Sequence, residues 1–155
     1  YNQGVTLSFE QWGLGGLANA YLADDKSRPE NYTDPSGLGL DGSFNTNVTP
    51  EWDDAGSFEE NLERIITQKW IANFNVDGME AWSEFRRTGY PRLLPPAHNA
   101  SGGVVPEGGY GHRTLYPITE KNSNMANYMD AVNKDLGGKD NVASRIWWDC
   151  NPNTL

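Results

Sequence analysis

The acidic side chains are the first residues in this sequence that could do chemistry, because two carboxyl groups together can hydrolyse a glycosidic bond. Such a pair must face each other across a cleft, one as acid and one as base or nucleophile. Glu59, Glu60 and Glu63 instead fall where a helix is expected to begin, and the helix dipole favours negative charge there. Glu84 is spaced to pair with an arginine of its own helix. We therefore predict no catalytic residues and no enzymatic activity.

Nucleophilic catalysis has equally little support in the sequence. The single cysteine, Cys150, excludes an intrachain disulfide and a zinc site built from cysteines. The two candidate bases, His98 and His112, both fall in expected loops, and no GxSxG nucleophile elbow occurs. We interpret Cys150 as a passive thiol.

Two loop motifs imitate cofactor or metal sites. The run Gly37–Gly42 matches GxGxxG, but that pattern binds a dinucleotide only between a strand and a helix, and here a polar loop surrounds it. The run that starts at Asp41 begins like an EF-hand calcium loop, yet Thr46 stands where Gly is needed and Trp52 where Glu is needed. We predict no cofactor and no dedicated metal site, and leave open a looser calcium bound by this loop.

Aromatic rings point to binding instead. Six Trp and seven Tyr occur in a chain whose mean hydropathy is −0.69, together with 17 Gly and nine Pro. This composition predicts a loop-rich domain with some rings on loops, where an aromatic face can stack on the apolar face of a sugar ring. Most of the rings are nevertheless expected in the core, since Trp is highly buried on average.

The net charge of −9 limits the partners. An acidic chain repels nucleic acid and anionic membrane surfaces, so we predict no nucleic-acid binding despite the pair Arg86 and Arg87. No apolar run approaches the ~18 residues of a membrane span, and no signal peptide is recognisable. The chain starts at Tyr1, and we expect it to be a piece of a longer protein whose targeting signal lies elsewhere.

The clearest element is a helix over about residues 58–74. Ser57 and Glu60 form a capping box, in which each side chain bonds a free backbone N–H of the other residue. Apolar residues then follow at spacings of three and four: Phe58, Leu62, Ile65, Ile66, Trp70 and Phe74. A second, short helix over about 79–87 should end at Gly89 and Pro91.

Two further helices complete the expected fold. One covers residues 3–22 with a break near Gly15, and one runs from a cap at Thr119 to Leu136, ended by Gly137 and Gly138. Long loops span 24–56 and 92–117, with a short strand near 47–52 left open. The sequence therefore predicts a mainly α fold with a few helices, long ordered loops and little or no sheet.

Five segments of the sequence resemble the C-terminal portion of SusD/RagB-like nutrient-binding proteins. They are LSFEQWG (7–13), WDDAGSFEENLERIITQKWIANF (52–74), EAWSEFRRTGYPRLLP (80–95), YPITEKNSNMANYMDAV (116–132) and DNVASRIWWD (140–149). Their order and spacing fit the family over nearly the whole chain.

The resemblance implies an outer-membrane lipoprotein of Bacteroidetes. Such proteins lie at the cell surface as a lid on a TonB-dependent SusC-like transporter and bind glycans or peptides before import. Their fold is mostly α-helical, with tetratricopeptide-like helix pairs in the N-terminal part. On this interpretation residues 1–155 are the SusD-like C-terminal domain, and the N-terminal part with its lipid anchor is absent from this chain.

The family resemblance does not name ligand residues. The runs RRTGYP (86–91) and WWD (147–149) are expected to be structural, and ligand residues are expected on the loops. The candidates are Tyr32 and Trp52 in the first long loop and Tyr110 and His112 in the second. The leading hypothesis is capture of an oligosaccharide. A peptide ligand, and a fragment that docks the transporter without binding a ligand, stay open.

Overall fold

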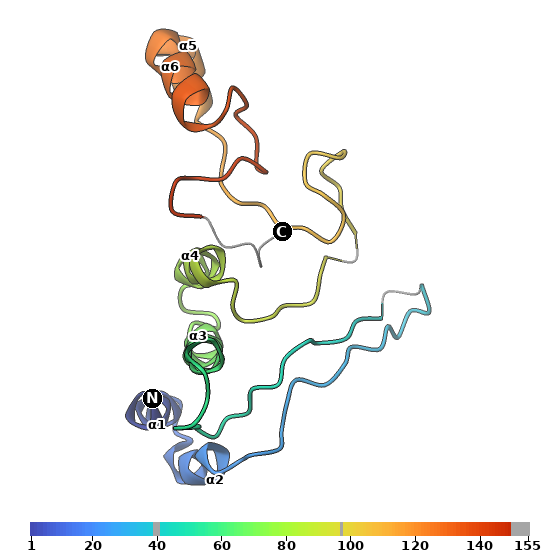
Figure 1. The fold of residues 1–155 in the computed structure, drawn as a ribbon, viewed down its shortest axis with the longest axis vertical. Helices are drawn as coiled ribbons and strands as arrows, with labels where there is room; N and C mark the ends of the chain where they lie inside the picture. The colour runs from blue at the N-terminus through green and yellow to red at the C-terminus, as the bar shows by residue number, and fades with distance from the viewer. Residues whose placement is uncertain (39–40, 97, 150–155) are drawn as a thin grey trace. The chain divides into compact units, whose positions relative to one another are not determined.

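The computed structural model describes residues 1–38, 41–96 and 98–149 (Figure 1). Helices are the regular secondary structure of these residues, and the one sheet-like feature among them is an isolated antiparallel bridge between Tyr32 and Gly42. The mainly α prediction is therefore confirmed, and no strand forms at 47–52. No helix in the described ranges is long and apolar enough to cross a membrane.

The chain divides into two compact units. The first contains Tyr1–Phe85 and Tyr90–Leu94, and the second contains Arg86–Gly89 and Pro95–Leu155. The assignment of residues 1–155 to a single domain stays a prediction.

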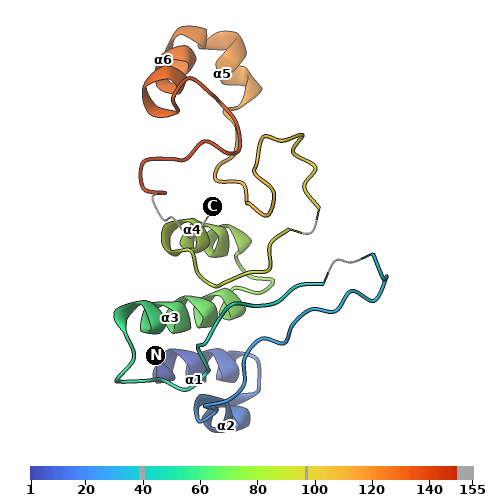
Figure 2. The same cartoon turned by 45° about the vertical axis from the view of Figure 1, so that its right-hand side comes forward.

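In the first unit, the expected break in the N-terminal helical segment is confirmed. Helix α1 (Asn2–Gln11) is followed by a short 3₁₀ turn (Gly15–Leu17) and by α2 (Ala18–Leu22). Gly13 has a φ of +72°, a left-handed conformation that a side chain would disfavour, and it turns the chain out of α1. In both views α1 lies between α2 and the next helix, α3 (Phe58–Ala72) (Figures 1 and 2).

Helix α3 begins with the predicted capping box. Ser57 Oγ accepts a hydrogen bond from the Glu60 N–H at 3.2 Å, and the Ser57 N–H donates to Glu60 Oε2 at 2.9 Å. Ser57 Oγ also donates to Glu60 Oε2 at 2.7 Å, and this bond, together with the one from the Ser57 N–H, lowers the pKa of the Glu60 carboxyl. The helix ends at Ala72, two residues before the predicted end.

We expect Ser57→Ala to lower the free energy of unfolding by about 1 kcal/mol, because the first turn of α3 loses its side-chain acceptor. Urea denaturation followed by circular dichroism measures the loss. Ser43→Ala is the control, since Ser43 is exposed in a loop and caps no helix. Equal effects of the two changes would contradict the prediction.

The buried side of α3 differs from the predicted apolar stripe. Of that stripe Ile66 is buried, with 4% of its surface exposed, whereas Phe58 and Phe74 are 77% and 68% exposed. The side chains of Glu63 and Arg64 are buried instead. A helical pattern predicts one apolar face, but it does not tell which part of that face other segments of the chain cover.

The burial of Glu63 corrects its interpretation as an acid placed only for the helix dipole. Glu63 Oε1 accepts a hydrogen bond from Thr46 Oγ1 at 2.5 Å, and its other oxygen lies 3.3 Å from Arg92 Nε. The carboxylate therefore joins α3 to the long loop before it and to the segment after α4.

Helix α4 (Gly78–Thr88) ends as predicted, with Gly89 at a φ of +76°. Its N-terminal part is tied to α3 through Lys69, whose Nζ lies 2.6 Å from Glu80 and 2.7 Å from Glu84. These hydrogen bonds raise the pKa of Lys69. Glu84, which the spacing pairs with an arginine of α4, thus has a partner on the neighbouring helix.

The second unit contains α5 (Ile118–Ser123) and α6 (Met125–Asp135), where the sequence predicted one helix. The prediction was wrong because Asn124 leaves the helical region with a φ of −137°. Its Nδ2 donates to Glu120 Oε2 at 2.8 Å, which stabilises the break. Thr119 is not the cap either, since Pro117 precedes the first turn. The predicted end is confirmed, because Gly138 at a φ of +84° donates its N–H to the Val132 carbonyl.

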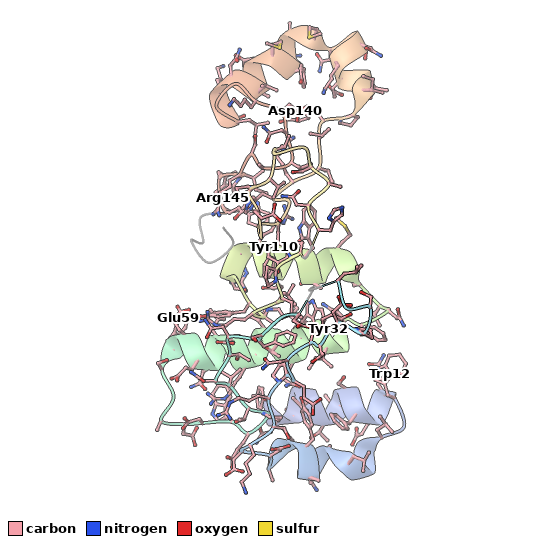
Figure 3. The ribbon with its side chains drawn as sticks, turned by 90° about the vertical axis from the view of Figure 1, so that its right-hand side faces the viewer. Trp12, Tyr32, Glu59, Tyr110, Asp140 and Arg145 are labelled. Carbon is pink, nitrogen blue, oxygen red and sulfur yellow. The ribbon has the colours of Figure 1, made fainter. Side chains whose placement is uncertain are left out.

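Asp140 is the main polar contact of this unit and lies at the base of the α5–α6 pair (Figure 3). Its side chain is 3% exposed and forms ion pairs with Arg113 and Lys121. It also accepts hydrogen bonds from Tyr128 Oη at 3.2 Å and the Tyr116 N–H at 3.3 Å. Burial raises the pKa of Asp140, but the bonds from Arg113, Lys121 and the Tyr116 N–H outweigh burial and lower the pKa to about 2.

Candidate functional site

The described residues of the first long loop, 24–38 and 41–56, form an arm with two limbs that run side by side (Figures 1 and 2). Tyr32 and Gly42 exchange backbone hydrogen bonds of 2.8 and 3.0 Å across the limbs. At the base of the arm the Glu51 N–H donates to the Asp24 carbonyl at 3.1 Å. Backbone hydrogen bonds thus hold the arm in place with little regular secondary structure.

The GxGxxG run lies at the end of this arm. Asp34 accepts hydrogen bonds from the backbone N–H groups of Ser36 and Leu38, both at 2.8 Å, and donates its own N–H to Asp41. Gly39 and Leu40 are outside the described residues. Aspartate side chains bond the described residues on either side of them, and those described residues lie in no strand or helix of the kind that a dinucleotide site needs.

Tyr32 is one of the two predicted ligand residues on the arm. Its residue surface is 45% exposed (Figure 3). Because its backbone is held by the bridge to Gly42, the ring is presented from a fixed position. Such a ring can stack on a flat ligand with a small entropy loss.

Trp52, the second predicted residue on the arm, borders a polar hollow of about 450 Å³. The polar hollow is lined by Asp25, Arg28, Asn47, Thr49, Glu51, Trp52, Asp53 and Arg64. The indole lies against the Tyr1 ring at 5.1 Å between centroids, and its Nε1 donates to Asp54 Oδ1 at 2.9 Å. Burial raises the pKa of Tyr1 to about 12, so its hydroxyl stays a donor, here to the Pro50 carbonyl.

Arg64 reaches the polar hollow from α3 and is 7% exposed. Its Nη1 donates to Asn61 Oδ1 at 3.0 Å, while its buried Nε has no hydrogen-bond partner among the described residues. Arg64, Arg28 and Asn47 line the polar hollow but are not among the predicted ligand residues, because that prediction was based on aromatic rings in loops. Nothing in the spacing of the α3 sequence separates Arg64 from a solvent-exposed arginine.

The other two predicted ligand residues lie in the second unit. Tyr110 is half-buried, and burial raises the pKa of its hydroxyl. His112 is 7% exposed, with Nδ1 2.7 Å from Asp149 Oδ2. Its backbone N–H donates to the Val142 carbonyl at 2.7 Å. Less of the His112 side chain than of the Tyr32 side chain is therefore available to a ligand. The role of Tyr110 and His112 in binding stays a prediction.

In the runs RRTGYP and WWD, which were expected to be structural, Arg86, Tyr90 and Asp149 are buried, whereas Trp147 is 88% exposed. The structural role of the two runs stays a prediction. Arg86 Nη1 donates to the His112 carbonyl at 2.6 Å, and its guanidinium lies 4.8 Å from the centroid of the Trp148 ring. In the first unit the Tyr90 hydroxyl donates to Glu59 Oε2 at 3.0 Å. Burial lowers the pKa of Arg86 and raises that of Tyr90.

An apolar groove of about 570 Å³ is a second cavity of the first unit. It is bordered by residues of α1, α2 and α3, among them Val5, Phe9, Tyr21, Ile65 and Ile71. Its lining is mostly apolar, so it offers fewer hydrogen-bonding partners to a polyhydroxylated ligand than the polar hollow does.

In the described ranges, no three or more His, Cys, Asp or Glu residues are grouped so that they could hold a metal ion. Cys150, interpreted above as a passive thiol, lies outside the described residues.

Comparison with known proteins gives one consistent result. The sequence pattern of the SusD-like family, described as Susd and RagB outer membrane lipoprotein, matches residues 1–149. A search of curated proteins found no match. A crystal structure of a SusD homolog from Bacteroides uniformis is 48% identical, with a TM-score of 0.83 over 97% of this chain and 31% of its own. A chitin-binding SusD homolog from Flavobacterium johnsoniae is 42% identical, with a TM-score of 0.87 over 99% of this chain and 31% of its own.

The helical fold and these matches agree on one family. The chain belongs to the SusD-like family. It spans about a third of the length of these solved relatives.

Proposed function

We propose that this chain is part of a cell-surface protein that captures an oligosaccharide and delivers it to a TonB-dependent SusC-like transporter. The observation that carries the proposal is the 42% identity, over 99% of the chain, to the chitin-binding SusD homolog from Flavobacterium johnsoniae. In this proposal residues 1–155 form the C-terminal part, and a lipid anchor on the N-terminal part holds the protein at the outer membrane.

The described residues support binding without a covalent step. Tyr32 offers an exposed ring, and Trp52 borders a cavity lined by amide, hydroxyl, carboxylate and guanidinium groups. Sugars are bound in this way, with ring faces on aromatic residues and hydroxyls on polar side chains. We propose Tyr32 and Trp52 as the leading ligand residues, and Tyr110 and His112 as secondary ones.

Calorimetric titration tests the capture of glycans. The full-length protein that contains residues 1–155 is titrated with chitohexaose, maltohexaose, xylohexaose and a mixture of tryptic peptides. We expect heat of binding with at least one glycan and none with the peptides. Peptide binding without any glycan binding would overturn the glycan proposal.

Delivery to a transporter is tested separately. The full-length protein, immobilised by a C-terminal tag, should retain the SusC-like protein encoded beside it from detergent-solubilised outer membranes. The 155-residue chain alone is the comparison, because retention by this chain without glycan affinity would favour a purely docking role.

A further inference from the structure

We propose that the polar hollow beside Trp52 is a sugar subsite, and that it prefers neutral or amino sugars over acidic ones. The inference rests on the proposed glycan-binding function and names the place and the charge class of the ligand. The volume of about 450 Å³ lies within the roughly 300–1,000 Å³ of small-molecule sites.

The lining of the polar hollow has unused hydrogen-bonding capacity. The side chains of Asn47, Thr49 and Glu51 form no hydrogen bonds with other described residues, although the Asn47 carbonyl accepts one from Arg28 Nε at 3.2 Å. An amide, a hydroxyl and a carboxylate together offer both donors and acceptors. This is the mixture that matches the hydroxyl groups of a sugar ring.

Arg64 is an independent sign that the hollow is built for a ligand. Its residue is more than nine-tenths buried, it lines the hollow, and Asn61 is its one hydrogen-bond partner among the described residues. Its buried Nε has no hydrogen-bond partner among the described residues, and leaving a buried donor unpaired costs free energy. Sugar oxygens placed in the hollow would be acceptors for the donors that face it.

Trp52 supplies the apolar surface of the subsite. Its ring is fixed twice, by the Tyr1 ring and by the hydrogen bond to Asp54. A fixed ring loses little conformational freedom when a sugar packs on it, so stacking contributes more to affinity.

The charges around the hollow select the ligand. Three carboxylates, those of Asp25, Glu51 and Asp53, border it together with two guanidinium groups, those of Arg28 and Arg64. The whole chain carries a net charge of −9. A uronic acid or sulfated sugar would meet this negative potential, whereas a neutral sugar or a protonated amino sugar would not.

Calorimetry of the full-length protein with three probes tests the proposal: chitohexaose, its deacetylated form and hexagalacturonate. Trp52→Ala and Asn47→Ala should each weaken binding of chitohexaose at least about tenfold, because they remove the ring and a hydrogen-bonding amide. Trp12→Ala is the matched control, since Trp12 is exposed at the end of α1, outside the hollow (Figure 3). It should bind within about twofold of the wild type.

The outcomes distinguish the proposed sugar subsite from the proposed capture of glycans. Wild-type affinity in Asn47→Ala and in a folded Trp52→Ala, checked by circular dichroism, would overturn the subsite while leaving glycan capture intact. Tighter binding of hexagalacturonate than of chitohexaose would overturn the charge preference. Binding of no glycan by the wild type would overturn the proposed function and the subsite together.

Discussion

Asp140→Asn is expected to lower the free energy of unfolding of the second unit by about 3 kcal/mol. The substitution replaces an oxygen that accepts bonds from Arg113 or Lys121 by an NH₂ group that points a donor at a cation. Arg113 is 9% exposed at its side chain, so its charge cannot return to water while the unit stays folded. Urea denaturation followed by circular dichroism measures the loss.

The pH dependence gives a second measurement of the same contact. The folded pKa of Asp140 is about 2, below its ordinary value of 3.8. The carboxylate therefore contributes its full stabilisation above pH 3.8, and this contribution is lost as the pH falls through 2. The difference in stability between the wild type and Asp140→Asn should shrink over that interval.

Asp130→Asn is the matched control for Asp140→Asn. Asp130 also pairs with a lysine, Lys134 at 2.7 Å, but both side chains are more than half exposed. Exposed ion pairs contribute about 0–1 kcal/mol, so this variant should unfold near the wild type. Comparable losses in the two variants would show that burial of Asp140 does not determine its contribution.

Ile66→Ala should lower the free energy of unfolding of the first unit by about 3 kcal/mol, since it leaves a cavity in the core beneath α3. Ile66 is 4% exposed, whereas its neighbour Ile65 is 44% exposed. The same substitution at Ile65 should change stability by less than about 1 kcal/mol. Urea denaturation measures the loss in free energy of unfolding for both variants. A larger loss for Ile65→Ala than for Ile66→Ala would contradict the burial of Ile66 under α3.

The helices were predictable wherever their ends carry a local chemical signal. The capping box at Ser57, the positive φ at Gly89 and the glycines after α6 each act within a few residues, and the structure confirms them. The break at Asn124 was missed because an asparagine in the middle of a helical pattern lowers helix propensity only slightly. Its bond to Glu120 decides the outcome, and the spacing alone does not reveal that bond.

The candidate site was less predictable, because its members come from segments far apart in the sequence. Trp52 could be chosen as an aromatic residue on a loop, and the hollow beside it exists. Arg64 could not be chosen, since its approach to Asn47 and Thr49 depends on how the arm crosses α3. Contacts of this kind follow from tertiary packing, which helical periodicity and turn residues do not specify.

The way in which the arm is closed affects how this protein can change during evolution. The bonds at its base end on main-chain carbonyls, from Glu51 to Asp24 and from Arg28 to Asn47. A carbonyl is present whatever the residue type, so substitutions at Asp24 or Asn47 keep these acceptors. Side chains of the arm other than Arg28 can therefore be exchanged while these two bonds are kept.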